Sequence, residues 1–135
     1  MTMTRDAFEQ LVEDALREIP RRFRKAMRNV AVIVEDEPSP ELLRQLGIER
    51  GGTLLGLYHG TPLPERSWDY GNTLPDRISI YQRPIEYVSR GDEDKTRECV
   101  IETVIHEFGH YFGLNEAEIR AIEDQYWHGD SGDRP

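Results

Sequence analysis

The spacing of apolar residues predicts a helix near the start of the chain, within residues 6–28. Its apolar residues recur at helical intervals and form one stripe: Phe8, Leu11, Val12, Ala15, Leu16 and Ile19. Pro20 cannot occupy a helix interior without the loss of a hydrogen bond, so we expect a kink or a break there. The residues after it, RRFRKAMRN, are predicted to form a second helical piece with Pro20 in its first turn.

Three later segments have the pattern of β-strands. Residues 30–34 are a run rich in β-branched residues that is followed by acidic residues and Pro38, as a buried strand would be. Residues 51–60, GGTLLGLYHG, contain a second strand between glycines, and residues 77–87, RISIYQRPIEY, begin with the alternation of a third. Pro84 predicts that the third strand ends there or lies at an exposed edge.

Helices are predicted between and after these strands. In residues 39–47, SPELLRQLG, a serine caps a short helix, a proline takes its first position and a glycine ends it. Residues 62–76 are predicted to form a loop because they are rich in turn-forming residues. A longer helix begins in the polar segment 89–99 and ends at Gly113, and Asn115 caps a last helix. This order predicts an α/β domain, of the α+β type, with a short mixed sheet.

The length, net charge and cysteine content of the chain limit the classes of protein to which it can belong. The 135 residues fit a single domain over residues 1–135, with a disordered tail at 127–135. The net charge of −9 argues against nucleic acid and anionic membranes as partners, because both need a basic surface. No run approaches the ~20 apolar residues of a membrane span. Because Cys99 is the only cysteine and the start lacks the pattern of a signal peptide, we expect a cytoplasmic protein.

The residues with the clearest chemistry lie in the segment 100–119, VIETVIHEFGHYFGLNEAEI. His106 and His110 are four residues apart, so on a helix they project from one face and can bind one zinc ion. Glu107 lies beside the first histidine, where zinc peptidases have the general base that takes a proton from water. The alternative is an ordinary amphipathic helix that carries histidines at its surface or in its core.

The apolar pattern of the same helix argues against that alternative. At 100° per residue, the helix has an apolar arc: Ile101, Ile105, Phe108 and Phe112, flanked by Val100, Val104 and Tyr111. This arc lies on the side away from His106 and His110. The histidines are therefore not part of the main apolar stripe, and we predict that they bind metal.

A third protein ligand would complete a zinc site that keeps one position open for water. Gly113 can take the left-handed conformation that ends a helix and turns the chain back towards the metal. Glu116, ten residues after the first histidine, is then the natural third ligand, unless it only stabilises the helix N-terminus. Glu118 is a rival that we expect to form a capping box with Asn115, and Glu123 is a second rival on the last helix.

Residues 106–116, HEFGHYFGLNE, resemble the extended motif H-E-x-x-H-x-x-G-x-x-H/D of metzincin zinc peptidases, with Glu116 in the last place. Together with FEQLVEDALREIP, NVAVIVEDEP, LLGLYHGTPL and DRISIYQRPIE, the segment is similar to a family of short bacterial zincin-like metallopeptidases. The resemblance covers most of residues 8–120 and implies a compact zincin fold with the active-site cleft below a short sheet. Metzincins carry a methionine turn after the motif, whereas all three methionines of this chain precede it.

A few residues outside the motif are weaker candidates for metal binding or for a place in the cleft. Cys99 lies two helical turns before the first histidine, too far for both to bind one zinc, and we expect it to be a packed thiol. His59 is expected to be an exposed loop residue rather than part of the cleft. Trp68, Tyr70 and Tyr81 are expected to pack in the core or at the surface, although a tyrosine could stabilise the oxyanion of a tetrahedral intermediate.

These observations lead to two hypotheses of different classes. The first is a zinc-dependent hydrolase that acts on a peptide or protein substrate, with zinc held by His106, His110 and Glu116 and with Glu107 as the general base. The second is a zinc-binding scaffold or interaction protein with little or no catalysis. Glu107 favours the enzyme, because a structural zinc site needs no base and usually has a closed fourth position.

Overall fold

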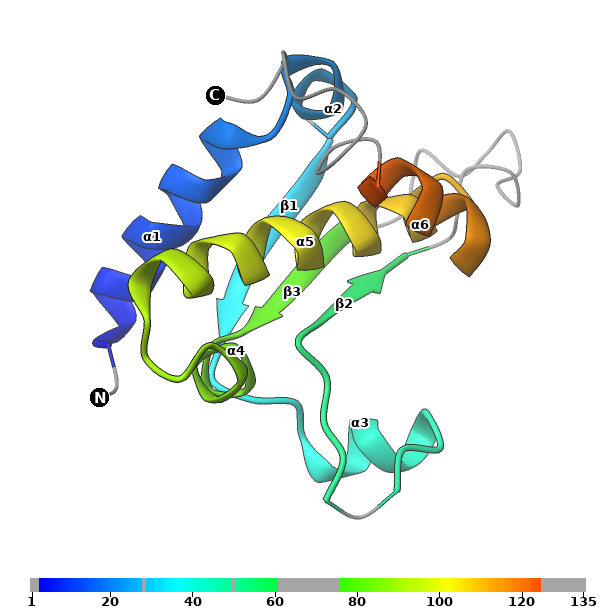
Figure 1. The fold of residues 1–135 in the computed structure, drawn as a ribbon. Coiled ribbons are helices and arrows are strands. Elements are labelled where there is room, and N and C mark those ends of the chain that lie inside the picture. The colour runs from blue at the N-terminus through cyan, green and yellow to red at the C-terminus, as the bar shows by residue number, and fades with distance from the viewer. Residues whose placement is uncertain (1–2, 28, 50, 61–75, 125–135) are drawn as a thin grey trace.

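In the part of the chain that the structure describes, the fold consists of a small sheet with helices packed on it and at its ends. The structure is a computed structural model, and it describes residues 3–27, 29–49, 51–60 and 76–124. In chain order its elements are α1 (Arg5–Glu18), α2 (Arg21–Ala26), β1 (Val30–Glu35), α3 (Pro40–Gln45), β2 (Gly56–His59), β3 (Asp76–Tyr81), α4 (Gln82–Ser89), α5 (Glu93–Tyr111) and α6 (Glu116–Asp124). Figure 1 shows α5 crossing one face of the sheet, with α1 beside it and α6 against its C-terminal part. The predicted α+β class is confirmed.

The N-terminal helices follow the predicted pattern. Five of the six residues of the apolar stripe on α1 and at its C-cap are buried, and Leu16 is partly buried. The side chain of Thr4 caps the helix by accepting a hydrogen bond from a backbone N–H of the first turn. α1 ends before Ile19, which is extended with ψ 136°, because a residue that precedes proline is disfavoured in the helical conformation. The expected break at Pro20 is therefore confirmed. α2 begins directly after Pro20, so this proline precedes the helix and is not in its first turn as predicted.

Among the described residues, three strands form the mixed sheet, with β3 in its centre. β1 pairs with β3 in parallel and β2 pairs with it in antiparallel fashion, so that Val32 and Tyr58 both lie opposite Ile78. Because side chains alternate along a strand, Ile78 and Ile80 face the core, and Ser79 lies on the opposite face of the sheet. The strand predicted within residues 51–60 is shorter than its pattern suggested and covers only Gly56–His59.

Residues 82–89 form the helix α4, so the prediction that the third strand continues through residues 82–87 is wrong. β3 ends at Tyr81, and the buried residues that follow it, Gln82, Ile85 and Ser89, have helical spacing. Pro84 lies in the first turn of α4, where a backbone N–H has no intrahelical partner to lose. Because β3 is the central strand, Pro84 does not mark an exposed edge.

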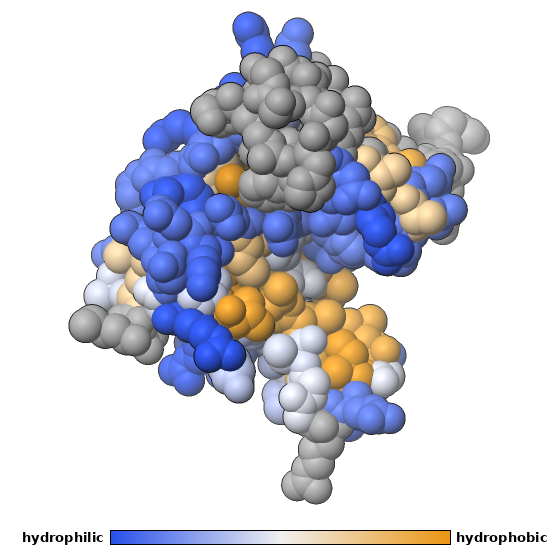
Figure 2. Space-filling model, in the orientation of Figure 1, coloured by the Kyte–Doolittle hydropathy of each residue, from blue (hydrophilic) through white to orange (hydrophobic). Residues whose placement is uncertain are grey.

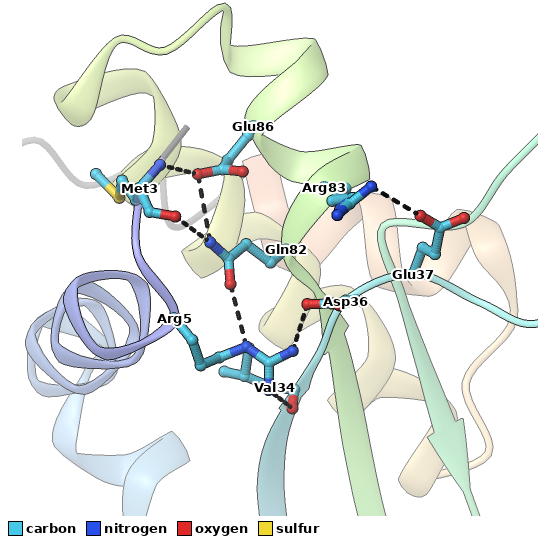
Figure 3. A network of polar contacts seen from close by, with 8 residues as sticks. All are labelled: Met3, Arg5, Val34, Asp36, Glu37, Gln82, Arg83 and Glu86. Atoms are coloured by element: carbon cyan, nitrogen blue, oxygen red, sulfur yellow. Dashed lines mark hydrogen bonds and ion pairs between the residues drawn. The ribbon is translucent and has the colours of Figure 1, made fainter. Parts of the chain in front are cut away.

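A polar network joins the start of α1 to the end of β1 and to α4 (Figure 3). The guanidinium of Arg5 donates to the backbone oxygen of Val34 and to the side-chain oxygen of Gln82, and it forms an ion pair with Asp36. The side-chain amide of Gln82, which is buried, donates to the backbone oxygen of Met3 at 2.9 Å. Three segments that are distant in sequence are therefore tied together at this end of the sheet.

The connecting segments agree with the sequence prediction where they are described. The side chain of Ser39 caps α3 by accepting from the N–H of Leu42 at 3.0 Å, and Gly47 follows the helix with φ 74°. Asp76, which the predicted loop included, is the first residue of β3. The rest of that loop and the predicted disordered tail, residues 127–135, lie outside the described residues.

The hydrophobic core lies between one face of the sheet and the helices α1 and α5. Phe8, Ile78, Ile85 and Val104 are among its fully buried side chains. Hydrophilic residues cover much of the side of the molecule shown in Figure 2, whereas apolar residues gather over α3 and the segment that leads into β2. None of the described helices is long and apolar enough to pass through a membrane.

Candidate metal centre

The helix α5 keeps its apolar face in the core, which fixes the direction of its other face. Asp92 caps the helix, because its side chain accepts a hydrogen bond from the N–H of Lys95 at 2.9 Å. Six residues of the predicted arc are buried: Val100, Ile101, Val104, Ile105, Phe108 and Tyr111. The prediction that Phe112 belongs to this arc is wrong, because Phe112 is the C-cap, where the chain leaves the helix, and it is exposed.

His106 and His110 project together from the half-buried side of α5. Their ring centroids are 5.2 Å apart, and the ring planes are tilted by 41°. One ligand atom each from His106, Glu107 and His110 lies within 4.8 Å of the others. The helix therefore brings two imidazoles and a carboxylate together, as the spacing predicted.

Glu107 points across to the edge of the sheet. Its Oε1 accepts a hydrogen bond from the backbone N–H of Tyr58 on β2, at 3.0 Å. Burial raises the pKa of the Glu107 carboxyl, and His110, the N–H of Tyr58 and His106 offset part of the rise. A carboxylate with a raised pKa is a stronger base, and the bond to β2 fixes it beside the histidines. Tyr58 could not be identified from the sequence, because its contribution comes from the backbone.

The turn after α5 has the geometry that the sequence predicted. Gly113 has φ 75°, in the left-handed region that glycine adopts without strain. The N–H of Gly113 donates to the carbonyl of His110 at 2.9 Å, and that of Leu114 to the carbonyl of Gly109 at 3.0 Å, which closes the helix end. The capping box is also confirmed, because Asn115 and Glu118 exchange side-chain to backbone hydrogen bonds of 2.9 and 2.8 Å.

This turn places Glu116, the first residue of α6, beside both histidines. Its Oε2 lies 3.4 Å from Nε2 of His106, and its Oε1 lies 3.5 Å from Nε2 of His110. The helix α6 can come this close because position 109 is a glycine, where an added Cβ would lie 2.5 Å from Cγ1 of Ile119. Ile119 is 1 % exposed, so this contact packs α6 firmly on α5.

A cleft of about 330 Å³ opens beside the histidines, between β2 with the segment before it and α5. Leu54, Leu55 and Thr103 line it together with His106 and Glu107. Two further carboxylates line it, those of Glu102 and Glu123. Oε1 of Glu123 lies 3.5 Å from Nδ1 of His106. Burial and the charges of Glu123 and Glu98 raise the pKa of Glu102.

The nitrogen Nε2 of His110 is buried and has no hydrogen-bond partner among the described residues. A buried polar atom without a partner is costly, and such an atom at a functional site commonly awaits a ligand or an ion. The contacts from Glu116 to both imidazoles are longer than an N–H···O hydrogen bond of ~2.7–3.2 Å, so these groups converge without satisfying one another. Two imidazoles and a carboxylate are ligands that zinc takes in proteins, so the residues present fit this metal.

Cys99, Tyr81 and His59 are not members of the group of possible metal ligands. Cys99 packs against the core, and burial raises the pKa of its thiol, as expected of a packed cysteine. Tyr81 is buried, which agrees with a packing role. The expectation that His59 is an exposed loop residue is wrong, because it is the half-buried last residue of β2. Trp68 and Tyr70 lie outside the described residues.

The comparisons with known proteins agree with this geometry. Residues 27–126 match the family described as zincin-like metallopeptidase. Among solved structures, the chain is similar to a conserved hypothetical protein from Thermo thermophilus, with 29 % identity and a TM-score of 0.52 over 90 % of this chain and 100 % of that one. The comparison with curated proteins gives no match. With a fold, a histidine pair and a family match that agree, the chain belongs to the zincin-like metallopeptidases.

Proposed function

We propose that the chain is a zinc-dependent hydrolase that cleaves peptide bonds in a peptide or protein substrate. His106, His110 and Glu116 are the zinc ligands, and Glu107 is the general base. The observation that carries this proposal is that the two oxygens of Glu116 lie 3.4 Å from Nε2 of His106 and 3.5 Å from Nε2 of His110, with the latter nitrogen buried and unpartnered among the described residues. Glu118, whose carboxylate is engaged in the capping box, is not assigned to the metal.

A metal ion bound by these ligands would supply chemistry that side chains alone cannot. A zinc ion held there would lower the pKa of bound water towards ~7 and polarise a carbonyl oxygen. The chain itself holds the ligands in place, because both histidines lie on one rigid helix and Glu116 lies on a helix packed against it. A site built on helices keeps its ligands in fixed positions better than a site built on loops.

Glu107 carries the proton in this mechanism. Its Oε1 is held by the N–H of Tyr58, so Oε2 is the oxygen that takes a proton from the attacking water and later gives it to the leaving nitrogen. The raised pKa of the carboxyl favours the first of these steps, because a very weak base would not accept the proton. A structural zinc site, by contrast, needs no general base beside its ligands.

The cleft beside Glu107 is the proposed binding place for the substrate chain. Its volume of about 330 Å³ is at the lower end of ligand pockets, which typically range over ~300–1,000 Å³. Leu54, Leu55 and Thr103 would contact the residues next to the cleaved bond. We place the activity in the cytoplasm, because the chain has one cysteine and no disulfide can form within it.

The test compares wild type with Glu107→Gln on a broad peptide library. Glutamine keeps the size of the side chain and can still accept from Tyr58 N–H, but it is not a base. We expect the variant to keep its zinc and its fold and to lose hydrolysis by ~10²–10⁴-fold. Glu98→Gln, an exposed position on the same helix, is the matched control and should cleave at the wild-type rate. If the zinc-loaded wild type cleaves nothing, the chain is better described as a zinc-binding scaffold or interaction protein.

A further inference from the structure

The ring of His106 lies between two carboxylates that both belong to α6. Oε2 of Glu116 is 3.4 Å from its Nε2, and Oε1 of Glu123 is 3.5 Å from its Nδ1. Glu116 and Glu123 are seven residues apart, so they lie on one face of the helix, about two turns or ~10.5 Å apart. The helix α6 therefore reaches both nitrogens of one imidazole, with its first turn on one side and its last turn on the other.

The two nitrogens of a neutral imidazole have different roles. One carries a proton and donates, whereas the other has a lone pair that accepts or binds a metal. A histidine that binds metal normally donates its other N–H to a carboxylate, a carbonyl or water, which fixes the tautomer and the orientation of the ring. The position of the second carboxylate therefore indicates which nitrogen of His106 is left for the metal.

We infer that Glu123 is a positioning residue of His106: its Oε1, which lies 3.5 Å from Nδ1 and so slightly beyond hydrogen-bond length, attracts the proton to Nδ1 and leaves Nε2 as the metal-binding atom. This inference rests on the proposed function. It is supported by the position of Glu116, which lies near Nε2 of both histidines, whereas Glu123 faces the opposite nitrogen of His106. The rival assignment of Glu123 as a zinc ligand is disfavoured, because Glu123 is not on the Nε2 side where the other candidate ligands meet.

The surroundings of Glu123 suit this role better than those of Glu116 would. The side chain of Glu123 is 24 % exposed and that of Glu116 is 62 % exposed, so the interaction of Glu123 with the ring is less screened by water. Ile119, between the two, is buried against Gly109 and holds α6 at a fixed distance from α5. The carboxylate is therefore held by the fold on the Nδ1 side of the ring.

The direct test is the tautomer of His106 in the metal-free protein, measured by long-range ¹H–¹⁵N NMR at pH ~8, well above the usual histidine pKa of ~6.5. In wild type we expect the proton on Nδ1. Glu123→Ala should move His106 towards the Nε2-protonated form or a mixture of the two forms. Glu123→Gln should keep the proton on Nδ1, because its amide oxygen can accept it. Asp124→Ala, which removes the neighbouring exposed carboxylate, should leave the tautomer unchanged.

The second readout is the zinc dissociation constant, measured by competition with a chelator. Loss of an outer partner of a ligand typically weakens metal binding by ~10–100-fold, which we expect for Glu123→Ala, with a smaller loss for Glu123→Gln. An unchanged His106 tautomer in Glu123→Ala would overturn the inference. So would a loss of zinc in Glu123→Gln as complete as in His106→Ala, since that would make Glu123 a ligand. If wild type binds no zinc, the proposed function fails, and the tautomer still shows whether Glu123 holds the ring.

Discussion

Two polar clusters lie on the two sides of the same sheet, and they differ in how completely their atoms are satisfied. The helix cluster lies on the α5 side and consists of His106, Glu107, His110 and Glu116. The strand cluster lies on the opposite face and has one residue from each strand: Glu35, Ser79 and His59. Both contain histidine and carboxylate, so composition alone does not tell a binding site from a structural network.

In the strand cluster, hydrogen bonds join the three side chains in a line, with Ser79 in the middle. The hydroxyl of Ser79 donates to Oε2 of Glu35 at 2.6 Å, so Nε2 of His59, 3.1 Å away, must donate to the same hydroxyl oxygen. Burial and the charge of Arg77 lower the pKa of His59, which favours the neutral ring, and a neutral ring that donates from Nε2 carries its proton there. Ser79 itself is fully buried. These hydrogen bonds join all three strands, and their role is therefore to hold the sheet together.

The helix cluster, by comparison, leaves hydrogen-bonding atoms unsatisfied. Glu116 approaches both imidazoles only to 3.4–3.5 Å, and Nε2 of His110 is buried without a partner among the described residues. In this molecule, unsatisfied donors and acceptors at one point are better evidence of a metal site than the presence of histidine. Variants that change one cluster, with zinc binding and stability both measured, therefore test whether the two clusters have different roles.

The largest expected effect is that of His110→Ala on zinc binding. Wild type should bind about one zinc per chain, and the variant should lose it, because two of the three proposed ligands cannot hold the ion with an open fourth position. Metal content after dialysis against a weak chelator measures this. His59→Ala is the matched control, since it removes a histidine from the strand cluster. Equal zinc loss in both variants would contradict the distinction between the clusters.

The second prediction separates the carboxylates at the start of α6. Glu116→Ala should weaken zinc binding strongly while the fold is kept, because its side chain is exposed and contacts the histidines. Glu118→Ala should keep zinc and lower the free energy of unfolding by roughly 0.5–2 kcal/mol, since it breaks half of the capping box. Chelator competition and urea unfolding distinguish the two. A zinc-bound structure with Glu118 or Glu123 on the metal and Glu116 in solvent would refute the assignment.

The smallest expected effect on zinc is that of Ser79→Ala. The change leaves Glu35 and His59 without their shared partner, which should cost roughly 1–3 kcal/mol of unfolding free energy. The zinc dissociation constant should stay within about twofold of wild type, because a stable folded state still presents the same helix cluster. Urea unfolding and chelator competition on the same samples measure both quantities. A tenfold loss of zinc affinity would show that the two faces of the sheet are coupled.

The sequence was most informative where the deciding interactions are local. The histidine pair, the turn at Gly113 and the capping box of Asn115 and Glu118 depend on residues within one or two helical turns, and all are present in the structure. Helix spacing and glycine conformation are enough to predict such features. The same reasoning placed Glu116 among the candidate ligands.

The features that the sequence did not reveal depend on long-range contacts or on competing local patterns. The alternation of Ile78 and Ile80 suggested a strand that continues past Tyr81, whereas burial at helical spacing makes the next residues α4. The bond between Tyr58 and Glu107 and the strand cluster arise only when β2 and β3 pair. His59 appeared to be a loop residue for the same reason, because its partner Ser79 is 20 residues away.

X-ray absorption at the zinc edge reports whether zinc is bound by two imidazoles and a carboxylate of the helix cluster. The measurement uses wild type loaded with one equivalent of zinc. We expect two imidazole ligands at ~2.0–2.1 Å, with oxygen in the remaining positions and no sulfur. A sulfur ligand at ~2.3 Å, which only a cysteine can supply at that distance, or fewer than two imidazoles, would contradict it.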